Sequence, residues 1–150
     1  MLRAFLTLVA VLVLAPAAMA GLTCSESSLL REVNRVRAQH GLGRLSADAH
    51  LERAARAHNR EMLRTKVIAH GAFGSRMLQF DVTGSLVGEN LAWGSGARSS
   101  ARMIVAAWLA SPEHRANLLG PSFTRVGVGT LVGPLLGFAR VRVVTADFAG

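Results

Sequence analysis

The chain contains one cysteine, Cys24, among its 150 residues. A lone thiol cannot form an internal disulfide, so no covalent cross-link is available to hold a small or loosely packed fold together. The chain must therefore stabilise itself by burying apolar surface between regular helices and strands.

Residues 1–20 have the order of a secretory signal. Arg3 is followed by an apolar run from Ala4 to Ala15, and the segment closes on Ala18-Met19-Ala20. This order predicts cleavage after Ala20, and the run is too short to span a bilayer core of about 30 Å. We expect a short lead over 21–28 and a single domain over 29–150, in a secreted or periplasmic protein with no transmembrane segment in the mature chain.

Cys24 lies shortly after the expected cleavage site, where a lipoprotein carries its lipid-bearing cysteine. A lipoprotein signal usually has a leucine upstream and a small residue directly before that cysteine, and here Gly21 and Thr23 take those places. We therefore favour a free, frayed thiol over a lipid anchor at Cys24, and both stay open.

Basic residues outnumber acidic ones by 17 to 9, and all but one of the basic residues are arginine. Arginine favours bidentate contact with phosphate, sulfate or carboxylate groups. Export and the absence of tyrosine count against a nucleic-acid-binding module. Anionic lipids or an anionic envelope surface fit this charge better.

The apolar spacing of the first half predicts two helices. The first begins near Leu29 and stops at Gly41, a residue type that ends helices. Ser46 caps the second, and Asp48 in its first turn suits the helix dipole. Its buried side is expected to hold Leu51, Ala54, Ala55, His58 and Met62.

Four arginines form a line on another side of the second helix: Arg53, Arg56, Arg60 and Arg64. Glu52 precedes Arg56 by one helical turn and is expected to pair with it. The remaining members, Arg53, Arg60 and Arg64, are candidates for contact with an anionic surface. The alternative is an ordinary solvated helix face.

The second half changes period. Residues 67–100 are glycine-rich and predict loops around a short helix over 75–80, whereas 101–110 and 112–119 predict helices. Residues 126–130 and 139–144 predict strands, with a turn at Gly133-Pro134 between them. In the last strand, Val141 and Val143 are expected inward, and Arg140 and Arg142 outward. The chain therefore reads as one α+β unit.

His70, Glu89 and His114 are the ionisable residues that packing explains least. His114 is the third residue of the helix begun by Pro112, where the positive helix terminus disfavours an imidazolium and keeps a lone pair free. Two neutral histidines and one carboxylate with an open fourth position suit a catalytic type of zinc site. The alternative is that Glu89 and His114 make only local hydrogen bonds.

The remaining histidines, His40, His50 and His58, are expected at the surface or at the edge of the core. Ser95 lacks the strand-elbow-helix context of a nucleophile. Trp108 is expected to be buried and structural.

The order of several motifs resembles the bacterial, cysteine-poor branch of the CAP superfamily, the SCP domain of cysteine-rich secretory, antigen 5 and pathogenesis-related proteins. The resemblance covers about Leu29 to Phe148. The motifs are Asn34-x-x-Arg37-x-x-His40-Gly41, His70, Gly88-Glu89-Asn90-Leu91-Ala92, Trp108-x-x-Ser111-Pro112-Glu113-His114-Arg115-x-Asn117 and Phe123-x-x-Val126-Gly127-Val128-Gly129.

This resemblance implies a three-layer α-β-α sandwich with a small antiparallel sheet and a shallow cleft that can hold a divalent metal, most simply zinc. His70, Glu89 and His114 match both histidines and one acidic residue of the family's cleft. Ser111 takes the place of the second acidic residue, which should weaken metal affinity. Glu113 adjoins His114 on a helix but points about 100° away, so it is no replacement.

Three functions are open. One is a non-enzymatic binding module with a metal-capable cleft and a lipid, envelope glycan or protein ligand, where lipid is implied by the resemblance. Another is a metal-dependent hydrolase with Glu89 as the base, although one carboxylate cannot easily serve as both ligand and base. The last is a structural envelope protein that uses the arginine line.

Overall fold

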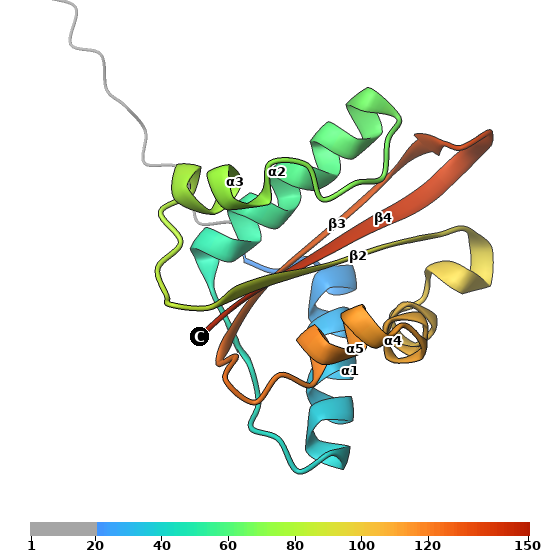
Figure 1. The fold of residues 1–150 in the computed structure, drawn as a ribbon. Coiled ribbons are helices and arrows are strands. Elements are labelled where there is room, and N and C mark those ends of the chain that lie inside the picture. The colour runs from blue at the N-terminus through green and yellow to red at the C-terminus, as the bar shows by residue number, and fades with distance from the viewer. Residues whose placement is uncertain (1–20) are drawn as a thin grey trace, which may run out of the picture.

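The computed structural model describes residues 21–150, so the expected signal and its cleavage site lie outside the described residues. The described chain forms three layers, with a four-stranded sheet between two groups of helices (Figure 1). The strands are β1 (Ser46–Ala47), β2 (Val87–Gly94), β3 (Arg125–Leu135) and β4 (Phe138–Ala149). This arrangement confirms the expected α-β-α sandwich.

The sheet has the strand order β1-β3-β4-β2, with the long hairpin of β3 and β4 at its centre. β2 and β3 both pair with β4 in the antiparallel sense, whereas the short β1 pairs with β3 in parallel. The sheet is therefore mixed at one edge, where a wholly antiparallel sheet was expected.

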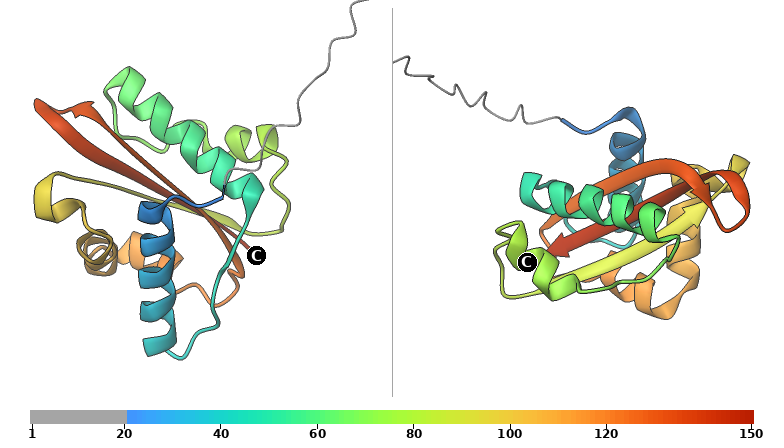
Figure 2. Two further views of the ribbon diagram at one scale, coloured as in Figure 1. Left: turned by 180° about the vertical axis from the view of Figure 1, so that it is seen from behind. Right: turned by 90° about the horizontal axis from the view of Figure 1, so that it is seen from above.

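Helices cover both faces of the sheet, as Figures 1 and 2 show. One face carries α2 (Ala49–Thr65) and α3 (Phe73–Gln79). The other carries α1 (Cys24–Gln39), α4 (Ala101–Ala110) and α5 (Pro112–Leu118), and a short 3₁₀ helix, η1 (Gly96–Ser99), precedes α4.

Helix α1 begins at Cys24, earlier than the apolar spacing indicated. Thr23 caps it, with its hydroxyl accepting from the Glu26 N–H while the Glu26 carboxylate accepts from the Thr23 N–H at 2.8 Å. This reciprocal capping box fixes the first turn. The polar lead over 21–28 is therefore largely helical, and Cys24 is an exposed first-turn residue of α1 instead of part of a frayed end.

The start of α2 also differs from the prediction. Asp48 is the N-cap and accepts from the backbone N–H groups of His50 and Leu51, whereas Ser46 lies in β1 and pairs with Arg125 of β3. Asp and Ser both suit an N-cap, so sequence spacing alone did not separate them.

One strand was missed, and both predicted strands were too short. Residues 87–94, expected as loop, form β2. Gly133-Pro134, expected as the turn, lies within β3, and the turn follows Leu135. A register shift between Gly133 and Leu135 accommodates the proline, which cannot donate a ladder hydrogen bond. β4 likewise continues to Ala149.

The face under α1, α4 and α5 holds the largest apolar cluster of the described chain. Trp108 is buried at its centre and donates its indole N–H to the Leu91 carbonyl at 2.9 Å, which confirms the expected structural role. The other members of this cluster include Leu29, Val33, Val36, Ile104, Val105, Val126, Val128, Val144, Ala146 and Phe148.

Helix α2 lies against β3 at backbone distance. A Cβ added to Gly127 would lie 2.0 Å from the Leu51 carbonyl carbon, and one added to Gly129 would lie 2.7 Å from the Ala55 carbonyl carbon. Small residues on both elements therefore permit this approach, and the approach places the polar side chains of α2 directly above the sheet.

Candidate functional site

Two carboxyl groups lie buried side by side on the face covered by α2 and α3. Glu89 of β2 is the register partner of Asp147 of β4, and their side chains are 2% and 0% exposed. Both oxygens of Asp147 lack a hydrogen-bond partner in the described chain. A buried carboxyl group without a partner is costly, so the surroundings must supply a cation or a proton.

Arg76 of α3 supplies the cation. One of its Nη atoms contacts Glu89 Oε2 and lies 3.9 Å from Asp147 Oδ1, while the other donates to the His70 carbonyl at 3.3 Å. The guanidinium carbon also lies 5.5 Å from the centre of the Phe73 ring. The short helix α3 thus positions Arg76 against the carboxyl groups of Glu89 and Asp147.

Two histidines flank Glu89. His70, whose side chain is 57% exposed, places Nδ1 2.7 Å from Glu89 Oε1. His58 of α2 is buried, with Nε2 2.9 Å from the Ala69 carbonyl and 3.8 Å from Glu89 Oε2. The shorter contact assigns the His58 Nε2 proton to Ala69, so His58 positions the loop that carries His70.

Burial dominates the electrostatics of this cluster. It raises the pKa of Glu89 to about 7 against the opposing effect of Arg76, and together with Glu89 it raises the pKa of Asp147 well above its usual range. It also lowers the pKa of His58 to about 4, helped by the Arg76 charge. The carboxyl pair therefore favours holding a proton near neutral pH, and His58 is neutral there.

His114 approaches the site from the other side of β2. Its carbonyl accepts from Asn90 of β2 at 2.8 Å, and Asn117 donates to the Glu89 carbonyl at 3.1 Å, so α5 is fastened to this strand. The His114 ring contacts Ser111, with Nδ1 2.8 Å from Oγ. Burial lowers the pKa of His114, with a smaller contribution from His70, in the direction expected for a neutral imidazole.

The structure thus brings His70 and Glu89 together, and Ser111 and His114 together, on two sides of one strand. Within residues 21–150, no group of three or more His, Cys, Asp or Glu side chains is arranged to hold a metal. Both Glu89 oxygens already have protein partners, His70 and Arg76. The donor set does not fit a metal as it stands, and zinc at His70, Glu89 and His114 stays a prediction.

Arg56 and Arg64 of the arginine line form ion pairs with carboxylates. Arg53 and Arg60 are exposed, Arg64 pairs with Glu61 at 2.6 Å, and Arg56 pairs with Glu26 at 2.7 Å in addition to the expected Glu52 at 3.7 Å. Contact of Arg53, Arg60 and Arg64 with an anionic surface stays a prediction.

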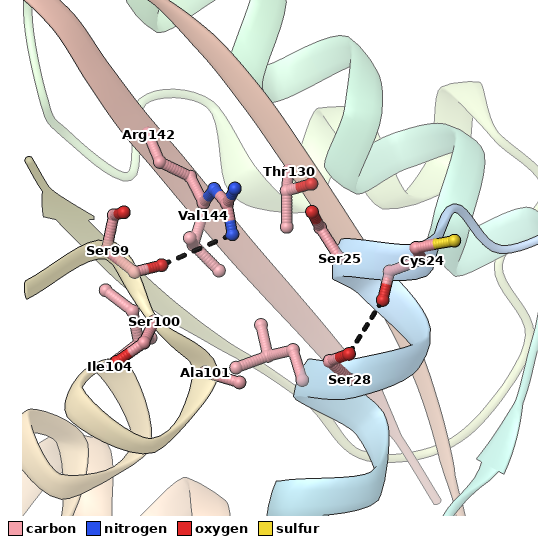
Figure 3. A pocket seen from close by; sticks show the side chains of 11 residues that line it. Cys24, Ser25, Ser28, Ser99, Ser100, Ala101, Ile104, Thr130, Arg142 and Val144 are labelled. Carbon is pink, nitrogen blue, oxygen red and sulfur yellow. Dashed lines mark hydrogen bonds between the residues drawn. The ribbon is translucent and has the colours of Figure 1, made fainter. Parts of the chain in front are cut away.

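A cavity of about 390 Å³ lies away from this site, between α1, η1, the start of α4 and the sheet (Figure 3). Its apolar side chains include Leu29, Ile104 and Val144. Arg142 reaches in from β4 and donates to the Ser99 carbonyl at 3.3 Å, so it lines a cavity instead of pointing to solvent as expected. The hydroxyl groups come from Ser25, Ser28, Ser99, Ser100 and Thr130.

Sequence reasoning missed Arg76 and Asp147, and it placed His58 outside the site. Asp147 carried a usable signal, because Thr145 and Asp147 alternate with apolar residues along β4 and so share one face. Arg76 carried none, since a single arginine in a glycine-rich segment is ordinary.

The comparisons with known proteins agree with this fold. Residues 30–148 match the Cysteine-rich secretory protein family, CAP. The match covers most of the chain, and the chain therefore belongs to the CAP family.

Three similar proteins are bacterial. The YkwD protein of Bacillus subtilis (strain 168) is 33% identical over 109 residues, which are 69% of this chain and 41% of YkwD. An extracellular SCP-domain protein of Bacillus anthracis is 26% identical with a TM-score of 0.70, over 87% of this chain and 44% of that one. An outer surface protein of Borrelia burgdorferi is 25% identical with a TM-score of 0.66, over 81% and 90%. The chain thus spans about two fifths of the YkwD length.

The described helices are also informative about membranes. None within residues 21–150 is long and apolar enough to cross a bilayer.

Proposed function

We propose that this chain is an exported, non-enzymatic binding module that holds a lipid-like ligand with an anionic head in the cavity of Figure 3. The observation that carries the proposal is the lining of that cavity. Leu29, Ile104 and Val144 offer an apolar floor, whereas Arg142 and the hydroxyl groups offer donors for an anionic head. None of the described residues that line it is acidic.

The alternative location, the Glu89 cluster, is less suited to an anion. Arg76 already contacts Glu89 and approaches Asp147, so its charge is used within the protein. The cavity volume of about 390 Å³ also falls within the range of roughly 300–1,000 Å³ that is usual for small-molecule sites. The resemblance to CAP proteins also implies a lipid ligand, and this agrees with the lining of the cavity.

Displacement of a fluorescent fatty acid by palmitate tests the proposal. Arg142→Gln should weaken binding about tenfold or more, because a charged hydrogen bond to the head group is lost. Arg140→Gln is the matched control, since Arg140 is an exposed arginine on the same strand. Equal binding by both variants and the unchanged protein would refute the cavity as the fatty-acid binding site. Binding of an envelope glycan or a protein with no fatty-acid binding would refute the ligand class.

Export is part of the same proposal. It is supported by the signal-like order of residues 1–20 and by the extracellular and outer surface relatives. Mass spectrometry of the protein recovered outside the cytoplasm should give a chain that begins at Gly21. A chain that begins at a lipid-modified Cys24 would show membrane anchoring instead.

A hydrolase is the second candidate, because a pKa of about 7 suits a carboxyl group for proton transfer at neutral pH. In this reading Glu89, beside the exposed His70, is the acid or base. Turnover of peptide, ester or peptidoglycan substrates that Glu89→Gln abolishes would establish it. Absence of turnover with all three substrate classes would leave the binding module.

A further inference from the structure

Arg76 is held at the carboxyl pair from several sides. Its guanidinium contacts Glu89, lies 3.9 Å from Asp147 Oδ1 and donates to the His70 carbonyl, and its side chain is only 10% exposed. The Phe73 ring lies over the guanidinium carbon. Each of these contacts fixes the charged group at one place in the cleft.

Asp147 is the second half of the pair. It is fully buried, and its carboxyl group interacts directly with that of Glu89, so the two groups can share a proton. A shared proton leaves one negative charge on the pair, and a buried charge requires a cation nearby. Arg76 is the cation that approaches both carboxyl groups.

We propose that Arg76 is a built-in cation that takes the place of a divalent metal at the Glu89–Asp147 pair and excludes a metal from it. A guanidinium stays charged at all ordinary pH values, so it cannot leave by losing a proton. A metal that binds Glu89 would have to displace Arg76 from Oε2 and the His70 ring from Oε1. This inference is independent of the ligand cavity and of the function proposed for it.

The position of His70 completes the argument. Its Nδ1 already lies 2.7 Å from Glu89 Oε1, and its ring is largely exposed. Removal of the guanidinium would free Glu89 Oε2 and leave the Asp147 carboxyl group without its nearby cation, while the His70 imidazole stays on Glu89 Oε1. Imidazole and carboxylate are ligand types that zinc accepts. The presence of Arg76 on α3 therefore determines whether a metal can bind to the Glu89–Asp147 pair.

Zinc titration calorimetry tests the exclusion. Arg76→Met should bind zinc about tenfold or more tightly than the unchanged protein, and Asp147→Asn or His70→Ala in the Arg76→Met background should remove that gain. Arg60→Met, an exposed arginine of α2, is the matched control and should behave as the unchanged protein. A folded Arg76→Met variant whose zinc affinity equals that of the unchanged protein would overturn the proposal.

A second variant keeps the test decisive. Arg76→Lys retains the charge and should stay as poor in zinc binding as the unchanged protein, so a gain equal to that of Arg76→Met would refute exclusion by charge. If Arg76→Met is unfolded without metal, zinc should restore its thermal transition, and circular dichroism reports this. An unfolded Arg76→Met variant that zinc does not restore would also refute the proposal.

Discussion

The face of the sheet beneath α1, α4 and α5 is filled by apolar side chains such as Trp108 and Phe148, whereas the centre of the opposite face carries Glu89 and Asp147. The polar face has apolar side chains only towards its two ends. Glu89 and Asp147 are buried, as Trp108 and Phe148 are, so exposure of these side chains to water does not explain the difference. The apolar face mainly stabilises the fold, whereas the polar face keeps ionisable side chains away from water.

Both faces belong to the same strands, so the register of each strand determines which side chains lie on which face. Along β4, Val144, Ala146 and Phe148 face the apolar layer, and Thr145 and Asp147 face α2 and α3. Thr145 donates to Asn59 of α2 at 2.8 Å, so the polar layer is tied to its helix by a specific hydrogen bond. A shift of β4 by one residue would exchange the layers, which is why the register is strongly specified.

The largest expected effect is on the apolar face. Trp108→Ala should lower the free energy of unfolding by about 3–5 kcal/mol, because it removes a fully buried ring and leaves the Leu91 carbonyl without its donor. Urea denaturation measures it. Trp93→Ala is the control: that ring is 42% exposed and should cost much less. A similar loss for both tryptophans would contradict the apolar face as the main source of stability.

The polar face should reveal itself through pH. The folded pKa of Glu89, about 7 against 4.5, gives stability that is present below 4.5 and lost as the pH rises to 7. The folded pKa of His58, about 4 against 6.5, gives stability that is present above 6.5 and lost as the pH falls to 4. The two contributions oppose each other, so the net change of stability with pH is smaller than either contribution alone.

Single variants separate these opposing contributions. Glu89→Gln should make the unfolding free energy rise more, or fall less, between pH 4 and 6.5 than in the unchanged protein, because only Asp147 then opposes His58. His58→Gln should leave a protein whose unfolding free energy falls between 4.5 and 7, with Asp147 adding in the same direction. Urea titrations across this range measure both. Two profiles parallel to that of the unchanged protein would show that the cluster does not set the pH dependence.

The contact between α2 and β3 should be the next most sensitive. Gly127→Ala should cost about 1–3 kcal/mol or more, because its Cβ would lie 2.0 Å from a backbone carbon of Leu51. Gly43→Ala is the matched control, since no atom lies within 4 Å of the added Cβ. Thermal unfolding compares the two. A Gly127→Ala variant as stable as Gly43→Ala would show that α2 can move away from the sheet.

The sequence was sufficient for the apolar face. Helical spacing around Val33 and Trp108 and the strand pattern at Val126 and Val128 were readable, because burial of one face leaves a period in the sequence. The polar face left less trace. Glu89 was found as an ionisable residue that packing did not explain and not as part of a strand, since β2 carries glycine and asparagine where alternation would be visible.

Convergence in space was the part that the sequence could not supply. His58 lies on a stripe that predicts burial, yet its contact with Ala69 depends on the path of a later loop. Arg76 and Asp147 are separated by most of the second half of the chain, and only the antiparallel pairing of β2 with β4 brings Asp147 beside Glu89. Local patterns do not encode such pairings, so the cluster needed the fold.

The smallest expected effect concerns the outer surface of the polar layer. Arg53 and Arg60 of α2 are exposed, whereas Arg64 pairs with Glu61. A well-placed cation near an anionic membrane surface contributes about 1 kcal/mol, and salt screens it. The protein should therefore sediment with anionic but not neutral vesicles at low ionic strength, and Arg60→Gln should weaken this more than Arg64→Gln, because Glu61 already offsets Arg64.

A matched pair of triple variants decides whether this surface or the total charge is responsible. Replacement of Arg53, Arg60 and Arg64 by Gln should remove most vesicle binding without unfolding the protein. The second variant replaces three exposed arginines from the part of the molecule that contains α1 and α5: Arg31, Arg44 and Arg115. It changes the net charge by the same amount and should leave most vesicle binding intact. Equal losses in the two triple variants would assign the attraction to net charge, because only a localised surface distinguishes variants of identical charge. Binding that survives both triple changes and high salt would show that α2 presents only a solvated face.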